Sequence, residues 1–462
     1  MKKSRLSKVT IIKVLFKTLI FIILTNLPFF ALSEFYKEWE EKIICNTLSN
    51  GLKILILPKH ETSTVSFLTY VNIGSLDEKP LKSGLAHLVE HILLFEGTES
   101  VRISDCDSEN INILQIQGEG GINIDAKTSP DCTLYFCSLP SDKVELFIKF
   151  QSESLVNPSL RSFYQEKNIV LEEKFLHDEK SLQKLNALML SVAFLRHPYR
   201  NPIGGYISDL ENIEIKDVLD FVKKNYISNK ILLAIVGDVD PHRVINLIAH
   251  YFKSFNRKDS AKTIISDEPL QNGERRIEVE NLDYPAILIA YRRPNANNPD
   301  DPVFDILASL FAGYRSSLLY KQIVIDEKIA SSVVCNPKFP GAKYSTLFVF
   351  WAFPFLNNSI PQIESIIYQN IEDFKRRLLT ENELNKAKNH LLANFEKKLQ
   401  SNLGIAQRLA YFEMIKGDWK KLFQYENEVR NVSIKDIKRV INKFFNKRNR
   451  VVVFTVDPEK DE

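Results

Sequence analysis

The stretch His87-Leu88-Val89-Glu90-His91 is the most informative part of this chain. Ser83 before it is a candidate N-cap and Gly97 after it is a candidate stop, so we predict a helix from residue 83 to residue 95. On a helix, His87 and His91 project from the same face because they are four residues apart. Their imidazoles can therefore both reach one zinc ion.

Glu90 immediately precedes the second histidine, which places its carboxylate beside the metal. There it can hold and deprotonate a metal-bound water. The alternative is a helix whose histidines only pack in the core. The chain has 8 histidines, and a chance match to this pattern is expected in roughly one such sequence in a hundred.

A third ligand is needed, because a catalytic zinc site has three protein ligands and one position for water. The stretch Glu166-Lys167-Asn168-Ile169-Val170-Leu171-Glu172-Glu173 lies on a helix that we predict from 163 to 177. Glu166 and Glu173 are two turns apart and share a face, so one can bind the metal while the other orients a ligand. The alternative is that both are solvated surface glutamates.

These motifs resemble those of the pitrilysin/insulinase family of inverted zincins, whose signature is His-x-x-Glu-His. The resemblance covers nearly the whole chain after the N-terminal segment, more weakly in the second half. The stretches that carry it are Gly84–His91, Glu96–Thr98, Gly120–Gly121, Ala126–Tyr135, His197–Tyr199, Pro202–Gly204 and Val236–Asp238.

The resemblance implies a zinc-dependent endopeptidase acting on short or unfolded peptides. It assigns five side chains: His87, His91 and Glu173 as ligands of one zinc ion, Glu90 as the base, and Glu166 as the carboxylate that orients a ligand. Glu173 is chosen over Glu172 because the family's ligand is the last residue of the 166–173 stretch. The alternative is a non-catalytic assembly or processing subunit of the same fold.

The edge strand that binds the substrate in this family shows one departure. Relatives have Asn before the alanine of the motif, whereas this chain has Asp125 before Ala126. Asp keeps an acceptor for the substrate backbone but loses the amide donor. We still expect a peptide to add as a strand near Asp125 and Ala126.

A second departure lies in the C-terminal half, where active single-chain relatives carry an Arg…Tyr pair that stabilises the oxyanion. The corresponding positions here are Val324 and Ser331, and neither side chain can donate a charged or phenolic hydrogen bond. Tyr320 or Lys321 could substitute only out of register. Since two-subunit members place the pair on a partner, we expect a heterodimer with a homologous non-zinc chain that supplies it.

The chain also repeats itself. Residues 212–218 align with 431–437, and without a gap the apolar run 231–236 aligns with 450–455. Repeated flanks favour duplication over chance. We therefore expect an α+β fold with two homologous halves, a zinc-binding half at 35–258 and a half without metal at 274–462, joined by a linker at 259–273. The resemblance implies mostly antiparallel sheets flanked by helices around a clam-like chamber.

The N-terminus predicts the compartment. Residues 1–33 combine a lysine-rich start, an apolar run and the small residues Ala31 and Ser33, which is typical of a signal peptide. The protein is then periplasmic or secreted. The alternative is an uncleaved anchor that leaves the body facing the periplasm. The net charge of +3 includes six cations before residue 34, so the body is slightly acidic and nucleic acid is not an expected partner.

Two features leave questions open. The five cysteines contain no CxxC pair, and their spacing does not decide whether any disulfide forms. They are Cys45, Cys106, Cys132, Cys137 and Cys335. Residues 101–119 lengthen the interval between His91 and Glu173, and we expect them to form an exposed loop near the site entrance.

Overall fold

A computed structural model describes residues 38–95, 113–156, 158–255, 268–280, 284–376 and 379–456. The predicted signal peptide, Cys106, residues 101–112 of the predicted loop and residues 259–267 of the predicted linker lie outside this range. The prediction of a loop is wrong for residues 113–118, which form a short helix with Ile116 buried. Each of the four described cysteines is a free thiol. Within the described residues, no helix has both the length and the apolar character needed to cross a membrane.

The first half contains one six-stranded sheet and a set of helices. Its strands are β1 (Ile44–Thr47), β2 (Lys53–Pro58), β3 (Thr64–Val71), β4 (Ile122–Thr128), β5 (Thr133–Pro140) and β6 (Ile231–Gly237). Its helices are α2 (Leu85–Phe95), α3 (Ile113–Gly118), α4 (Val144–Val156), α5 (Phe163–Glu179), α6 (Ser181–Ala193), α7 (Ile207–Glu211), α8 (Ile215–Asn225) and α9 (Pro241–Tyr251).

The second half has the same composition. Its strands are β7 (Arg275–Val279), β8 (Ile287–Arg293), β9 (Ala330–Phe339), β10 (Thr346–Pro354) and β11 (Arg450–Thr455). Its helices are α10 (Asp301–Ala312), η5 (Tyr320–Asp326), α11 (Ile360–Arg376), α12 (Glu381–Lys398), α13 (Asn402–Met414), α14 (Lys421–Asn431) and α15 (Ile434–Phe444).

The two sheets have matching topology. Their strand orders are β1-β2-β6-β3-β5-β4 and β7-β11-β8-β10-β9, which correspond strand for strand once β1 is set aside. In the first sheet β6 is parallel to β2, and in the second sheet β11 is parallel to β7. The other strand pairs are antiparallel. The predicted α+β fold of two homologous, mostly antiparallel halves is confirmed. The boundaries at 258 and 274 stay a prediction.

The repeat that the sequence predicted is visible at the end of each half. α8 begins at Ile215 and β6 at Ile231, while α15 begins at Ile434 and β11 at Arg450. Each strand therefore starts 16 residues after the first residue of its helix. An aspartate at the third helical position, Asp217 or Asp436, caps each helix start.

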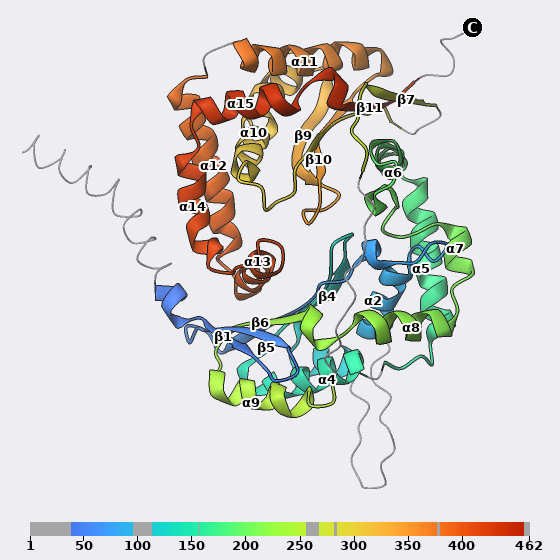
Figure 1. The fold of residues 1–462 in the computed structure, drawn as a ribbon, viewed down its shortest axis with the longest axis vertical. Helices are drawn as coiled ribbons and strands as arrows, with labels where there is room; N and C mark the ends of the chain where they lie inside the picture. Colours follow the sequence, from blue (N-terminus) through green and yellow to red (C-terminus); the bar gives the residue numbers. More distant parts are fainter. Residues whose placement is uncertain are drawn as a thin grey trace, which may run out of the picture.

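Each sheet receives a helix from the opposite half. Helix α13 packs on β3, β5 and β6, and helix α6 packs on β7, β8 and β11. Figure 1 shows α13 just above β5 and β6, and α6 beside β7 and β11. Because both faces of each sheet are covered, the central strands are apolar throughout, as in β6, whose seven residues are all buried.

A buried carboxylate also joins the halves. Asp131, in the turn between β4 and β5, accepts hydrogen bonds from the hydroxyl of Tyr199 at 2.5 Å and from the backbone N–H of Ala342 at 2.6 Å and Lys343 at 3.1 Å. Gly341 is required there, because a Cβ at this position would lie 2.6 Å from the Asp131 carboxylate. The turn next to β4 is thereby fixed to the second half.

Candidate metal site

Helix α2 begins differently from the sequence prediction. Ser83 does not cap it, because the Ser83 N–H and hydroxyl both donate to Asp209. Glu78 instead accepts hydrogen bonds from the N–H groups of Gly84 at 3.2 Å and Ala86 at 2.8 Å. A carboxylate suits this position because free N–H groups and the positive end of the helix dipole meet there. Glu78 thus fixes the start of the helix that carries both histidines.

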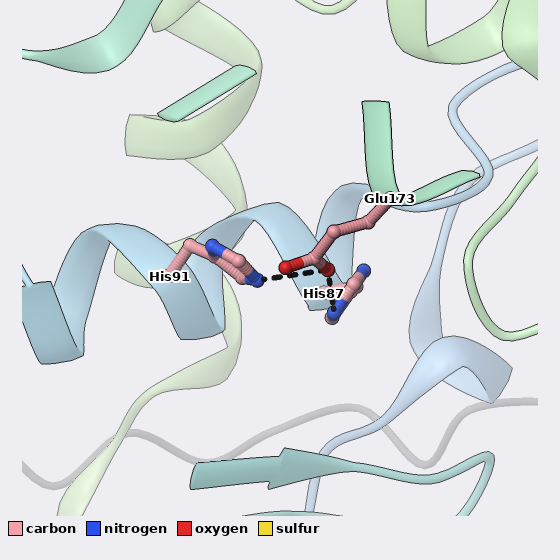
Figure 2. A group of neighbouring side chains, drawn as sticks. All are labelled: His87, His91 and Glu173. Atoms are coloured by element: carbon pink, nitrogen blue, oxygen red, sulfur yellow. Dashed lines mark ion pairs between the residues drawn. The ribbon is translucent and has the colours of Figure 1, made fainter. Parts of the chain in front are cut away.

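Three predicted ligands meet above this helix. One donor atom each from His87, His91 and Glu173 lies within 4.8 Å of the others. The Glu173 carboxylate, reaching in from α5, lies 3.8 Å from Nε2 of His87 and 3.5 Å from Nε2 of His91. Figure 2 shows it between the two imidazoles. Glu172 is exposed and does not join the group.

Glu166, one of the two predicted carboxylates on α5, contacts the other side of His91. Its Oε2 lies 3.4 Å from Nδ1 of His91, and its side chain is 9% exposed. His91 therefore presents Nε2 to Glu173 and Nδ1 to Glu166. A carboxylate on the far nitrogen is the arrangement that fixes the tautomer and ring orientation of a metal-binding histidine.

The histidines are held in their neutral forms. Burial lowers the pKa of His87 to about 4, and the nearby His91 lowers it further while Glu173 opposes the shift. Burial also lowers the pKa of His91. A neutral imidazole keeps the lone pair that a metal ion needs.

Glu90 lies beside the group and is buried, with 8% of its surface exposed. Burial raises the pKa of Glu90 to about 7, hydrogen bonds from Thr128 lower it, and the charges of Asp125 and Glu173 raise it. Its Oε2 has no hydrogen-bond partner among the described residues. Thr128 was not identified from the sequence, because only the fold brings the end of β4 to the helix.

The donor set fits a zinc ion. Two imidazole nitrogens and one carboxylate oxygen are a usual three-ligand set for catalytic zinc, and they leave one position for water. Among the described residues, no Lys or Arg forms a salt bridge with Glu173, whose side chain is 50% exposed. The group therefore combines neutral donors, one negative charge and access from solvent.

The predicted substrate strand β4 lies at the edge of its sheet. Asp125 is exposed and Ala126 is buried. The Asp125 carboxylate accepts a hydrogen bond from the N–H of Ala126 at 2.9 Å. Just before them the strand is irregular: Asn123 has a positive φ of 53° and the pairing with β5 shifts between Ile122 and Asp125. Asp125 thus covers a backbone donor on this strand.

The two positions where the resemblance implies an Arg…Tyr pair carry neither residue. Val324, in η5, packs against the core of the second half. The hydroxyl of Ser331 donates to the backbone carbonyl of Phe353 at 3.1 Å. Of the two possible substitutes, Lys321 is paired with Asp326 at 2.6 Å and Tyr320 packs against the same core.

Comparison with protein families gives two matches. Residues 53–205 match the model described as insulinase (peptidase family M16), and residues 212–391 match the model described as the peptidase M16 inactive domain. Together they cover well over half of the chain.

Individual relatives extend over the same length. The zinc protease PqqE of Helicobacter pylori is 26% identical over 416 residues, which is 88% of this chain and 91% of that protein. The mitochondrial-processing peptidase subunit beta of Lentinula edodes is 24% identical over 413 residues, 86% of each chain. The crystal structure of a protease from Helicobacter pylori superposes with a TM-score of 0.80, at 24% identity, over 90% of this chain and 99% of that one. This last likeness concerns the fold.

Proposed function

Because this chain belongs to the insulinase family of peptidases (family M16), we propose that it is a zinc-dependent endopeptidase. The observation that carries the proposal is the meeting of His87, His91 and Glu173 at one point, with Glu90 buried beside them. Named relatives include a zinc protease and a processing peptidase subunit, which supports peptide hydrolysis as the reaction.

The chain's own residues divide the work. When bound, a zinc ion would polarise the attacking water and the scissile carbonyl. Glu90 would accept a proton from that water and pass it to the leaving amine, and a pKa near neutrality suits a group that takes and returns a proton. Glu166 would hold His91 in the orientation that presents Nε2.

The substrate would bind as an added strand along β4. An edge strand offers unpaired backbone groups to an extended peptide. The N–H of Ala126 is covered by Asp125, so a peptide that uses this donor must first displace the carboxylate. The exposed Asp125 would then face the substrate backbone as an acceptor only.

The missing oxyanion donors support a heterodimer. Val324 and Ser331 occupy the positions where the resemblance implies Arg and Tyr, and Lys321 forms an ion pair with Asp326. A homologous chain without zinc would supply the pair. The N-terminal 33 residues support export, and we place the working enzyme in the periplasm or outside the cell.

A non-catalytic subunit is the second candidate, since residues 212–391 match a model described as inactive. The retained His87, Glu90, His91 and Glu173 argue against it, because a subunit without chemistry has no use for all four. Zinc content separates the two readings.

The test compares the purified protein with two neighbouring variants. Wild type and Glu172→Gln should each bind one zinc per chain, and Glu173→Gln should lose it, because only Glu173 joins the histidines. Peptide hydrolysis, followed with and without a chelator and with the partner chain present, should track zinc content. A wild-type protein that binds no zinc, or a Glu173→Gln protein that keeps it, would contradict the proposed site.

The partner is tested separately. The chain should be nearly inactive when purified alone and should gain activity when a homologous chain carrying the Arg/Tyr pair copurifies with it. Full activity from a single purified species would overturn the heterodimer while leaving the zinc site intact.

A further inference from the structure

A cavity of about 270 Å³ lies within the second half, away from the metal-binding residues. It is enclosed by α10, α12, α13, α14 and the end of β9. Its polar lining is dominated by cations, namely Lys338, Lys398, Arg408 and Lys416, with Tyr411 and Tyr425 between them. None of these residues has a part in the proposed hydrolysis.

Two buried aspartates form the floor of this cavity. Asp301 is 1% exposed and is paired with Arg293 at 2.6 Å and Lys416 at 2.7 Å. Asp305 is paired with Lys338 at 2.6 Å. The three cations already exceed the two carboxylates, so the floor needs no further positive charge.

Lys398, which is exposed to solvent, and Arg408, which is half-buried, add two more cations to the lining of the cavity. Among the described residues, no carboxylate forms a salt bridge with either of them. Arg408 lies over the ring of Phe395 at 5.5 Å, which holds its guanidinium in place. Burial lowers the pKa of Lys398, and the charges of Arg408 and Lys338 lower it further against the opposing charge of Asp305. These cations therefore repel one another across the cavity.

We propose that this cavity is a binding site for an anionic group of the carboxylate or phosphate type, held by Lys398 and Arg408. An anion would relieve the repulsion, and a guanidinium with a fixed plane can bind two oxygens at once. A free phosphate ion and the C-terminal carboxylate of a peptide offer this same chemistry. The second source rests on the proposed peptidase function, and the first does not.

Binding of inorganic phosphate to the zinc-loaded protein is measured by calorimetry. Lys398→Gln and Arg408→Gln should each weaken binding at least tenfold, and Arg408→Lys should retain most of it. Lys397→Gln is the matched control, because Lys397 is as exposed as its neighbour Lys398 on the same helix but does not line the cavity. Its affinity should stay within twofold of wild type. Thermal unfolding of each variant identifies any that fails to fold.

The peptide source is tested on this chain together with its homologous partner, with two peptides that differ only in a free or an amidated C-terminus. If the carboxylate occupies the cavity, wild type should cleave the free acid at least fivefold better in kcat/KM, and Arg408→Gln should lose this preference. Either phosphate binding or acid preference that depends on Lys398 and Arg408 supports the proposal. If Lys398→Gln and Arg408→Gln both keep the phosphate affinity and the acid preference of the wild type, the proposal is overturned. Wild type that stays inactive even with its partner chain would contradict the proposed function, while the phosphate measurement still decides the cavity.

Discussion

Helices α2 and α10 hold corresponding places in the two halves, yet they use buried polar residues in opposite ways. Each helix follows the strand β3 or β8 and precedes the edge strand β4 or β9. Each carries two polar residues four positions apart, His87 and His91 on α2, and Asp301 and Asp305 on α10.

On α10 the pair is neutralised by the protein itself. Arg293, Lys416 and Lys338 surround the two carboxylates at 2.6 to 3.3 Å. These cations hold the pKa of Asp301 below its usual range even though burial opposes the shift. Neither carboxylate is left free to bind an external cation.

On α2 the protein does not neutralise the negative charge that lies beside the histidine pair. The histidines are neutral, the nearby carboxylate of Glu173 is half exposed, and no described Lys or Arg pairs with it. The comparison teaches that one position in a repeated fold can serve either stability or ligand binding. The position stabilises the fold when neighbouring Lys and Arg side chains balance the carboxylates. It binds a ligand when a bound cation has to balance the carboxylate instead.

The largest expected effect concerns Glu90 on α2, which has no corresponding acid in the α10 network. Glu90→Gln should lower peptide hydrolysis about 10⁴-fold, because Gln cannot take a proton from water, while zinc content stays at one per chain. A fluorogenic peptide and metal analysis measure the two quantities. Substantial residual activity would remove Glu90 from its role as base.

A second prediction concerns α10. Asp301→Asn should lower the free energy of unfolding by about 3 to 5 kcal/mol, because it leaves Arg293 and Lys416 buried without their carboxylate. Zinc content should not change. Asp326→Asn, which breaks the exposed pair with Lys321, should cost less than about 1 kcal/mol. Denaturant unfolding measures both, and equal stability of the two variants would show that the α10 network does not stabilise the fold.

A third prediction asks whether the halves respond to acid together. Burial lowers the pKa of His197 to about 4, with Glu268 opposing and Arg292 adding to the shift. His197 packs against Tyr344 of the second half, with ring centroids 5.1 Å apart. Because the unfolded chain takes up a proton near pH 6.5 and the folded chain does not, stability should fall between pH 6.5 and 4. The loss should be at most about 3 kcal/mol.

His197→Asn isolates this contribution. Asn can replace Nδ1 as acceptor for the N–H of Tyr199 but does not titrate. The variant should lose less stability than wild type between pH 7 and pH 4.5, in a single unfolding transition. Two separate transitions would show that the halves unfold independently, and an unchanged acid dependence would show that His197 does not contribute.

The smallest expected effect tests the residue that orients His91. Glu166→Gln should weaken zinc binding about tenfold, because Gln still accepts a hydrogen bond but lacks the charge that polarises the imidazole. Competition with a chelator measures the affinity, and Glu172→Gln on the same helix should leave it unchanged. Equal affinities would indicate that the contact at 3.4 Å has no role in holding the metal.

Local patterns predicted many of the elements correctly. The apolar run of β6 and the helices α2 and α5 lie within a few residues of their expected positions, since each depends on neighbouring residues. The strand order and the exchange of α6 and α13 depend on contacts between distant residues, so the sequence did not show them. Helices α11 to α14 were not predicted although local signals mark some of them, such as the capping box of Thr380 and Glu383 at the start of α12.

The candidate site divides in the same way. His87, Glu90 and His91 follow from helical spacing, and the resemblance selected Glu173, which the structure brings to the histidines. The start of α2 was wrong: Ser83 satisfied the local rule for a cap, but its hydroxyl is taken by Asp209, 126 positions away. Thr128 and the cations around Asp301 were also missed, because the fold alone brings them into place.

The exchange of α6 and α13 between the halves has a consequence for how such a chain can arise and be divided. Each sheet owes one of its two covers to the other half, so either half made alone would present a bare apolar face to water. Two separately encoded pieces, made together, would cover each other's sheets without any peptide link. Fusion or fission of the gene between the halves therefore leaves both sheets covered, whereas loss of one half exposes an apolar face of the other.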